Sequence, residues 1–124
     1  MKFLWTTIHV KDLDESAAFY TDIVGLKVLR RFVARPGVEI AFLGFGGQGE
    51  TKVELISGER TGDEPFAGNI AIGFEVESAD AMMEFLKEKN IAIHSGPFES
   101  PNHKFFFVKD PGGLNVQFFE QRKP

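Results

Sequence analysis

The sequence predicts an α+β fold in which two β-α-β-β-β modules form a cupped mixed sheet. A strand, a helix and three strands follow one another twice along the chain. The signals that end the two helices, Gly25 and Asn90, lie 65 positions apart, about half of the 124 residues. The length and the 43% hydrophobic content suit one domain. We therefore predict a single domain with module one at about residues 1–57 and module two at about 68–122.

Module one begins with a strand at residues 3–10, where apolar and polar side chains alternate. A helix follows, because Asp12 and Glu15 have the spacing of a capping box and apolar residues then recur at helical spacing. Gly25 suits the left-handed conformation that ends many helices. The three strands expected next are residues 26–34, 39–45 and 51–56, separated by turns rich in glycine.

Module two repeats this order after a polar, glycine-containing linker at residues 57–68. We expect a strand at 69–76 and then a helix capped by Ser78, with Asn90 at the C-cap. The remaining short strands are expected at residues 91–94, 104–109 and 114–120, with prolines and glycines between them.

The composition excludes several classes of protein. The net charge is -4 and no basic stripe is visible, which argues against nucleic acid as a partner. The chain has no cysteine, so it has no disulfide and no thiolate site, as is typical of a reducing compartment. No apolar run approaches the roughly 20 residues that span a bilayer, and the first residues lack a signal-peptide core. We expect a soluble, cytoplasmic protein with no membrane partner.

One face of the predicted strands collects polar and aromatic side chains, while the other face is apolar. If the modules curl into a common sheet, this face lines a concave cup of the kind that binds ligands. An ordinary solvated sheet face is the alternative. The residues on this face are Trp5, Thr7, His9, Lys52, Glu54, Asn69, Ala71, Gly73, Asn115, Gln117 and Phe119.

Four motifs resemble those of the vicinal oxygen chelate superfamily, which includes glyoxalase I, bleomycin-resistance proteins and extradiol dioxygenases. The resemblance covers nearly the whole chain and implies a glyoxalase-like fold. It also implies a homodimer in which each cup combines the first module of one chain with the second module of the other. The motifs are residues 9–16 (HVKDLDES), 19–26 (FYTDIVGL), 53–55 (VEL) and 110–113 (DPGG).

The resemblance also bears on metal binding. Glyoxalase I members hold a divalent metal through four side chains, and the corresponding positions here are Trp5, Glu54, Asn69 and Gln117. Only Glu54 matches the family pattern. Tryptophan offers no ligand atom, and neutral amides bind transition metals weakly. The 2-His-1-carboxylate set that dioxygenase iron needs is also missing. We therefore predict no metal and no other cofactor.

The three histidines and a phenylalanine run offer further candidates. His9 lies on the cup face and can act with a neighbouring carboxylate as acid or base, or pack as a structural residue. His94 and His103 fall in predicted connections, where surface positions are expected. Phe105 and Phe107 share one strand face, so we expect them to contact a ligand or a partner subunit, with core packing as the alternative.

Two functions from different classes remain. In the first, the protein binds or sequesters a small molecule: Trp5 and phenylalanine rings stack on it, and Glu54, Asn69 and Gln117 supply polar contacts. In the second, it is a lactoylglutathione lyase-like lyase or isomerase. Glu54 would then abstract a proton next to a carbonyl, and His9 or a cation would stabilise the enediolate. We favour binding, because Trp5 and Gln117 stand where a metallo-lyase needs ligands.

Overall fold

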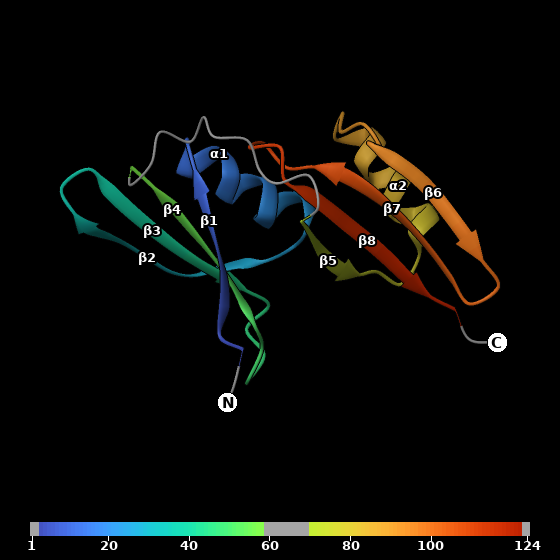
Figure 1. Cartoon of the computed structure of the whole chain (residues 1–124), viewed down its shortest axis with the longest axis horizontal. Coiled ribbons are helices and arrows are strands. Elements are labelled where there is room, and N and C mark those ends of the chain that lie inside the picture. The colour runs from blue at the N-terminus through green and yellow to red at the C-terminus, as the bar shows by residue number, and fades with distance from the viewer. Residues whose placement is uncertain (1–2, 59–69, 123–124) are drawn as a thin grey trace. The chain divides into compact units, whose positions relative to one another are not determined.

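The computed structural model describes residues 3–58 and 70–122 (Figure 1). The chain divides into two compact units, Met1–Glu64 and Pro65–Pro124, which are called the first and second module below. Each module contains a strand, a helix and three further strands in that order, and each has its own four-stranded mixed sheet. The predicted α+β fold of two β-α-β-β-β modules is confirmed. No helix in the described ranges is long and apolar enough to cross a membrane.

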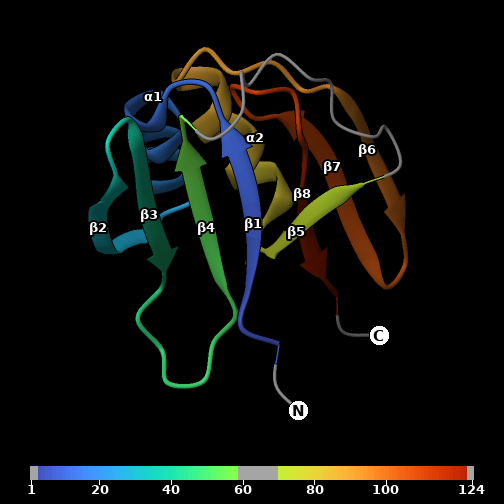
Figure 2. The same cartoon turned by 60° about the vertical axis from the view of Figure 1, so that its left-hand side comes forward.

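In the first module the strands lie in the order β1-β4-β3-β2 (Figure 2). The β1 strand runs parallel to β4, and the other neighbours are antiparallel. The elements are β1 (Trp5–Val10), α1 (Leu13–Ala18), a π-helical turn η1 (Phe19–Ile23), β2 (Lys27–Arg35), β3 (Val38–Gly44) and β4 (Lys52–Ser57).

The predicted caps hold the helix of this module. The Asp12 carboxylate accepts a hydrogen bond from the backbone N–H of Glu15 at 3.0 Å. We predicted one continuous helix, but the structure has an α-helix followed by a π-helical turn. Just beyond this turn, the N–H of Leu26 donates to the carbonyl of Tyr20 at 2.9 Å. Gly25 has φ +90°, the left-handed conformation predicted for it.

The core of the first module lies between its sheet and its helix. Alternate residues of three strands face the helix, and Ala41, Leu43 and Leu55 are fully buried there. The helical segment contributes Tyr20, which is also fully buried. Leu4, expected on this apolar face, is 51% exposed because it precedes the first residue of β1. The opposite face of the sheet, called its open face below, carries the predicted site residues of this module, Trp5, Thr7, His9 and Glu54.

The second module repeats this topology with the strand order β5-β8-β7-β6, and β5 runs parallel to β8. The Ser78 hydroxyl caps the helix by accepting from the Ala81 N–H at 3.1 Å. Asn90 has φ 60° just after the helix, as a C-terminal residue in the left-handed region does. The elements are β5 (Ala71–Glu75), α2 (Ala79–Glu88), β6 (Ser95–Ser100), β7 (His103–Lys109) and β8 (Asn115–Gln121).

The strand predicted at residues 91–94 was wrong. The backbone N–H of Ile91 still donates to the carbonyl of Leu86 in α2. The start of this segment therefore closes the end of the helix and does not form a strand. The strand of this region is β6, which begins after residue 94 and contains Pro97. The pairing of β6 with β7 is irregular between Ser95 and Phe98, and β6 lies at the edge of the sheet, where a proline without an N–H is tolerated.

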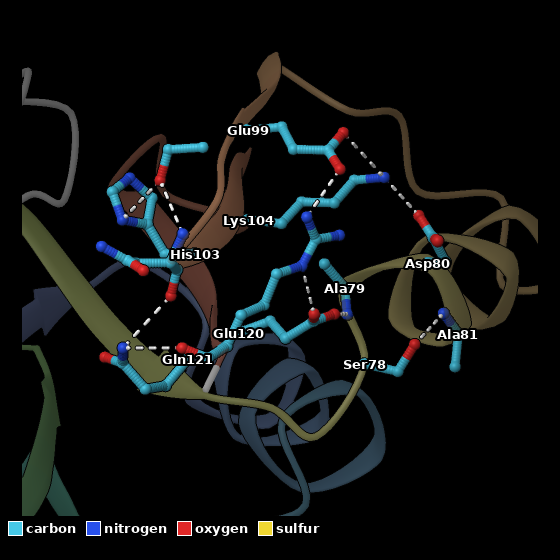
Figure 3. Close-up of polar contacts among 12 residues, drawn as sticks. Ser78, Ala79, Asp80, Ala81, Glu99, His103, Lys104, Glu120 and Gln121 are labelled. Carbon is cyan, nitrogen blue, oxygen red and sulfur yellow. Dashed lines mark hydrogen bonds and ion pairs between the residues drawn. The ribbon is translucent and has the colours of Figure 1, made fainter. Parts of the chain in front are cut away.

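Charged side chains connect the strands of the second module to the start of α2 (Figure 3). The Glu120 carboxylate accepts from the Ala79 N–H at 2.7 Å, near the positive end of the helix. Arg122 bonds to Glu120 at 2.8 Å and to Glu99 at 2.6 Å. The ammonium of Lys104 lies 2.6 Å from the Asp80 carboxylate. These contacts tie three strands to the helix.

Candidate functional site

A polar pair lies on the open face of the first module, where β1 and β4 run side by side. Their parallel register places Thr7 opposite Glu54. The hydroxyl of Thr7 donates a hydrogen bond to Oε1 of Glu54 at 2.6 Å. Hydrogen bonds to a carboxylate are short and comparatively strong, so this contact fixes the orientation of the Glu54 side chain.

Aromatic rings flank this pair. The indole of Trp5 meets the ring of Phe42 edge to face, with centroids 5.2 Å apart and an angle of 68°. Phe42 is the β3 neighbour of Glu54, and its ring stacks on Phe32 at 6.4 Å. The guanidinium of Arg30 lies 4.3 Å from the centre of the Phe32 ring, within cation–π range. Trp5 is 44% exposed, so this row of side chains is open to a ligand.

His9 lies on the same strand face but does not form the expected pair with the carboxylate. Its register partner on β4 is Ile56, and the strand residue that contacts Glu54 is Thr7. The Nδ1 atom of His9 is buried and has no hydrogen-bond partner among the described residues. The structure therefore brings Trp5, Thr7 and Glu54 together and leaves His9 beside them.

The open face of the second module is more apolar. Gln117 pairs with Gly73 across β5 and β8 and with Phe107 across β7 and β8. Phe105 packs edge to face on Phe107, with centroids 5.9 Å apart, and stacks on Phe119 at 5.8 Å. Phe105, Phe107 and Gln117 are all half-buried on this face.

The phenylalanine run and the remaining histidines are now placed. Phe106 points to the other side of β7 and is fully buried in the core. His103 was expected in a connection, but it belongs to β7; its Nδ1 lies 3.1 Å from the Ser100 hydroxyl and its ring stacks on Phe119. His94 precedes β6 and is exposed, as predicted.

The predicted site residues fall in both modules. Trp5, Thr7, His9 and Glu54 lie on the first, whereas Gln117 and the two phenylalanines lie on the second. Asn69 lies outside the described residues. Sequence reasoning missed Phe32, Phe42 and Arg30. A signal existed for Phe42, because it alternates with the buried residues Ala41 and Leu43 and so must lie on the open face.

The side chains at the predicted site positions do not suit the divalent metal of glyoxalases. Trp5 offers no ligand atom, so Glu54 is the one charged ligand among the predicted metal positions that the structure describes. Gln117 offers only a neutral amide. Within residues 3–58 and 70–122, no three histidine, cysteine, aspartate or glutamate side chains form a group that could hold a metal ion.

Paired β-α-β-β-β modules, each with an open sheet face, define the glyoxalase class of fold. Residues 2–118 match the family model described as the Glyoxalase/Bleomycin resistance protein/Dioxygenase superfamily. The chain belongs to this superfamily.

Individual relatives agree with this assignment. The chain is 30% identical over 126 residues to YwbC of Bacillus subtilis, covering 94% of each chain. It is 31% identical over 131 residues to a lactoylglutathione lyase of Haemophilus influenzae, covering 98% of this chain and 94% of that one. Among solved structures, the trypanothione-dependent glyoxalase I of Leishmania major is similar with a TM-score of 0.84 and 28% identity, covering 97% of this chain and 86% of that one.

Proposed function

We propose that the protein binds a small aromatic or apolar molecule on the open face of the first module without a metal ion. The observation that carries this proposal is the ring pair of Trp5 and Phe42, 5.2 Å apart, next to the hydrogen-bonded Thr7 and Glu54. Exposed rings supply a flat apolar surface, and the carboxylate supplies a polar contact that orients a ligand.

The proposal includes further contacts and a second subunit. Gln117, Phe105 and Phe107 form a half-buried, more apolar face in the second module, and we propose them, with Asn69, as additional ligand contacts. We also propose that the two modules form one domain and that the chain is a homodimer. Sedimentation should show a dimer; a stable monomer that still binds its ligand would contradict this part.

Trp5 provides a direct test, because it is the only tryptophan of the chain. Benzyl alcohol absorbs at shorter wavelength than indole, so a titration with this probe can be followed by Trp5 fluorescence. We expect a saturable change. In ligand-detected NMR, Trp5→Phe should weaken binding of the probe by about 1 to 2 kcal/mol, because a smaller ring remains.

Phe45→Leu is the matched control, since Phe45 is 55% exposed and lies beyond the end of β3. This variant should bind like wild type. Equal losses in both variants, or no binding by wild type, would overturn the proposed site.

The second candidate function is that of a lyase or isomerase. It is supported by the presence of Glu54 and by the lactoylglutathione lyase relative that is 31% identical. Glu54 would take a proton from the carbon next to a carbonyl, and His9 or a bound cation would stabilise the resulting enediolate. Isomerisation of a hemithioacetal at a rate set by added nickel or zinc would replace the binding proposal.

A further inference from the structure

Glu54 stands where glyoxalases place a metal ligand, but its neighbour gives it another task. We propose that Thr7 positions Glu54 as a fixed acceptor for a neutral hydrogen-bond donor, a hydroxyl or an amide N–H, on the ring-bearing ligand. This inference rests on the proposed binding function. Thr7 is then a positioning residue and Glu54 is the group that touches the ligand.

The geometry of the pair supports these roles. The Thr7 hydroxyl has one proton, which it donates to Oε1 of Glu54 over 2.6 Å. A donor bound to one oxygen restricts the rotation of the carboxylate and so fixes its orientation. Among the described residues no donor bonds to Oε2, which can therefore accept from a ligand. Thr7 is exposed and Glu54 is half-buried, so a ligand can reach them.

The neighbouring charges decide what kind of donor fits. Lys52 lies two residues before Glu54 on the same face of β4, opposite Trp5. The guanidinium of Arg30 lies over Phe32 on the same face. A cationic ligand attracted by Glu54 would also meet these two positive charges, which offset that attraction, whereas a neutral donor bonds to the carboxylate without this repulsion. The rings of Trp5 and Phe42 indicate that the donor group is attached to an aromatic or apolar body.

The second module shows that the fold does not require a hydroxyl at this position. Gly73 lies opposite Gln117 in the parallel pair of β5 and β8, just as Thr7 lies opposite Glu54. Thr7 also precedes the helix cap Asp12 by the same five residues that separate Gly73 from Ser78. The same backbone position therefore folds with no side chain at all, and the hydroxyl of Thr7 is available for a function.

Two isomeric probes separate the donor from the ring. Benzyl alcohol has a hydroxyl donor, and anisole has the same atoms and a similar ring but no donor. We expect wild type to bind benzyl alcohol about fivefold more tightly than anisole, the effect of one net hydrogen bond. Thr7→Val keeps the shape of the side chain but should bring this ratio close to one. Thr7→Ser restores the hydroxyl and should keep the preference.

Each outcome decides the inference. An unchanged ratio in Thr7→Val, or equal binding of the two probes by wild type, would overturn it. If Trp5→Phe still weakens both probes in that case, the proposed binding function stands alone. If wild type binds neither probe, the proposed function fails as well. The ratio is the informative readout, because a general loss of structure would weaken both probes together.

Discussion

The open faces of the two modules share one backbone frame and differ in chemistry. In the first, Glu54 receives a hydrogen bond from Thr7 and has Phe42 as its β3 neighbour. In the second, Gln117 has Phe107 in the corresponding place and faces Gly73, which has no side chain. The aromatic neighbour occurs in both, so it belongs to the shared frame. The charged, oriented acceptor belongs to the first module, which is where the proposed selection of the ligand would take place.

The largest expected change in stability comes from comparing substitutions on the two faces of β7. Phe106 is fully buried and packs on Phe118 with centroids 5.6 Å apart, whereas Phe107 is half-buried on the open face. Phe106→Ala should lower the free energy of unfolding by about 3 to 5 kcal/mol, because it leaves a cavity. Urea denaturation measures this change. Phe107→Ala should cost much less, and an equal cost would mean that both rings belong to the core.

A smaller effect is expected from exchanging the residues that differ most between the modules. Thr7→Gly should lower the free energy of unfolding by about 1 kcal/mol, since glycine is unfavourable in strands and the bond to Glu54 is lost. Gly73→Thr should raise it by up to about 1 kcal/mol, because this glycine has no left-handed φ and the flexible Gln117 side chain, whose Oε1 would lie 3.3 Å from the added Cβ, can turn aside. Thermal unfolding of both variants tests whether positions 7 and 73 are equivalent. Destabilisation by Gly73→Thr would show that they are not.

The smallest effect concerns the charges of the second module. The hydrogen bond from Arg122, followed by that from the Ala79 N–H, lowers the pKa of Glu120. A lowered pKa in the folded state stabilises the protein above the usual carboxyl range, and this stabilisation is lost as the pH falls through the folded pKa. Glu120→Gln should therefore lower the melting temperature near neutral pH, and its difference from wild type should narrow below about pH 4.

Glu39 of the first module is the matched control for that prediction. The hydrogen bond from Arg31 lowers its pKa in the same direction. The difference in melting temperature between Glu39→Gln and wild type should also narrow below about pH 4, and this variant leaves the second module unchanged. If the difference between Glu120→Gln and wild type stayed constant with pH, the network around Arg122 would not be the source of its stability.

Much of the fold could be predicted from the sequence, because strand alternation and helix caps are local signals. Alternation also placed Trp5, Thr7 and Glu54 on one face. Contacts between strands were harder to predict, since the pairing of β2 with β3 shifts between Val28 and Arg30 and again between Val33 and Arg35. No local pattern predicts such shifts.

The errors in the second module also have a physical cause. Pro97 and Pro101 are signals of connecting segments, but Pro97 is tolerated in the edge strand β6. Reading these prolines as breaks moved the expected strand to residues 91–94 and left His103 outside β7. The positions of β6 and of His103 therefore depend on pairing with neighbouring strands of the sheet.

The central claim is that the first module binds its ligand through Trp5 and Glu54 without a metal ion. The most direct measurement is a titration of Trp5 fluorescence with benzyl alcohol, carried out once with a chelator and once with added zinc. The account predicts the same saturation curve in both conditions, because Trp5 has no ligand atom and the described residues hold no group of three metal-ligating side chains. Binding that appears only with zinc, or that the chelator abolishes, would contradict it.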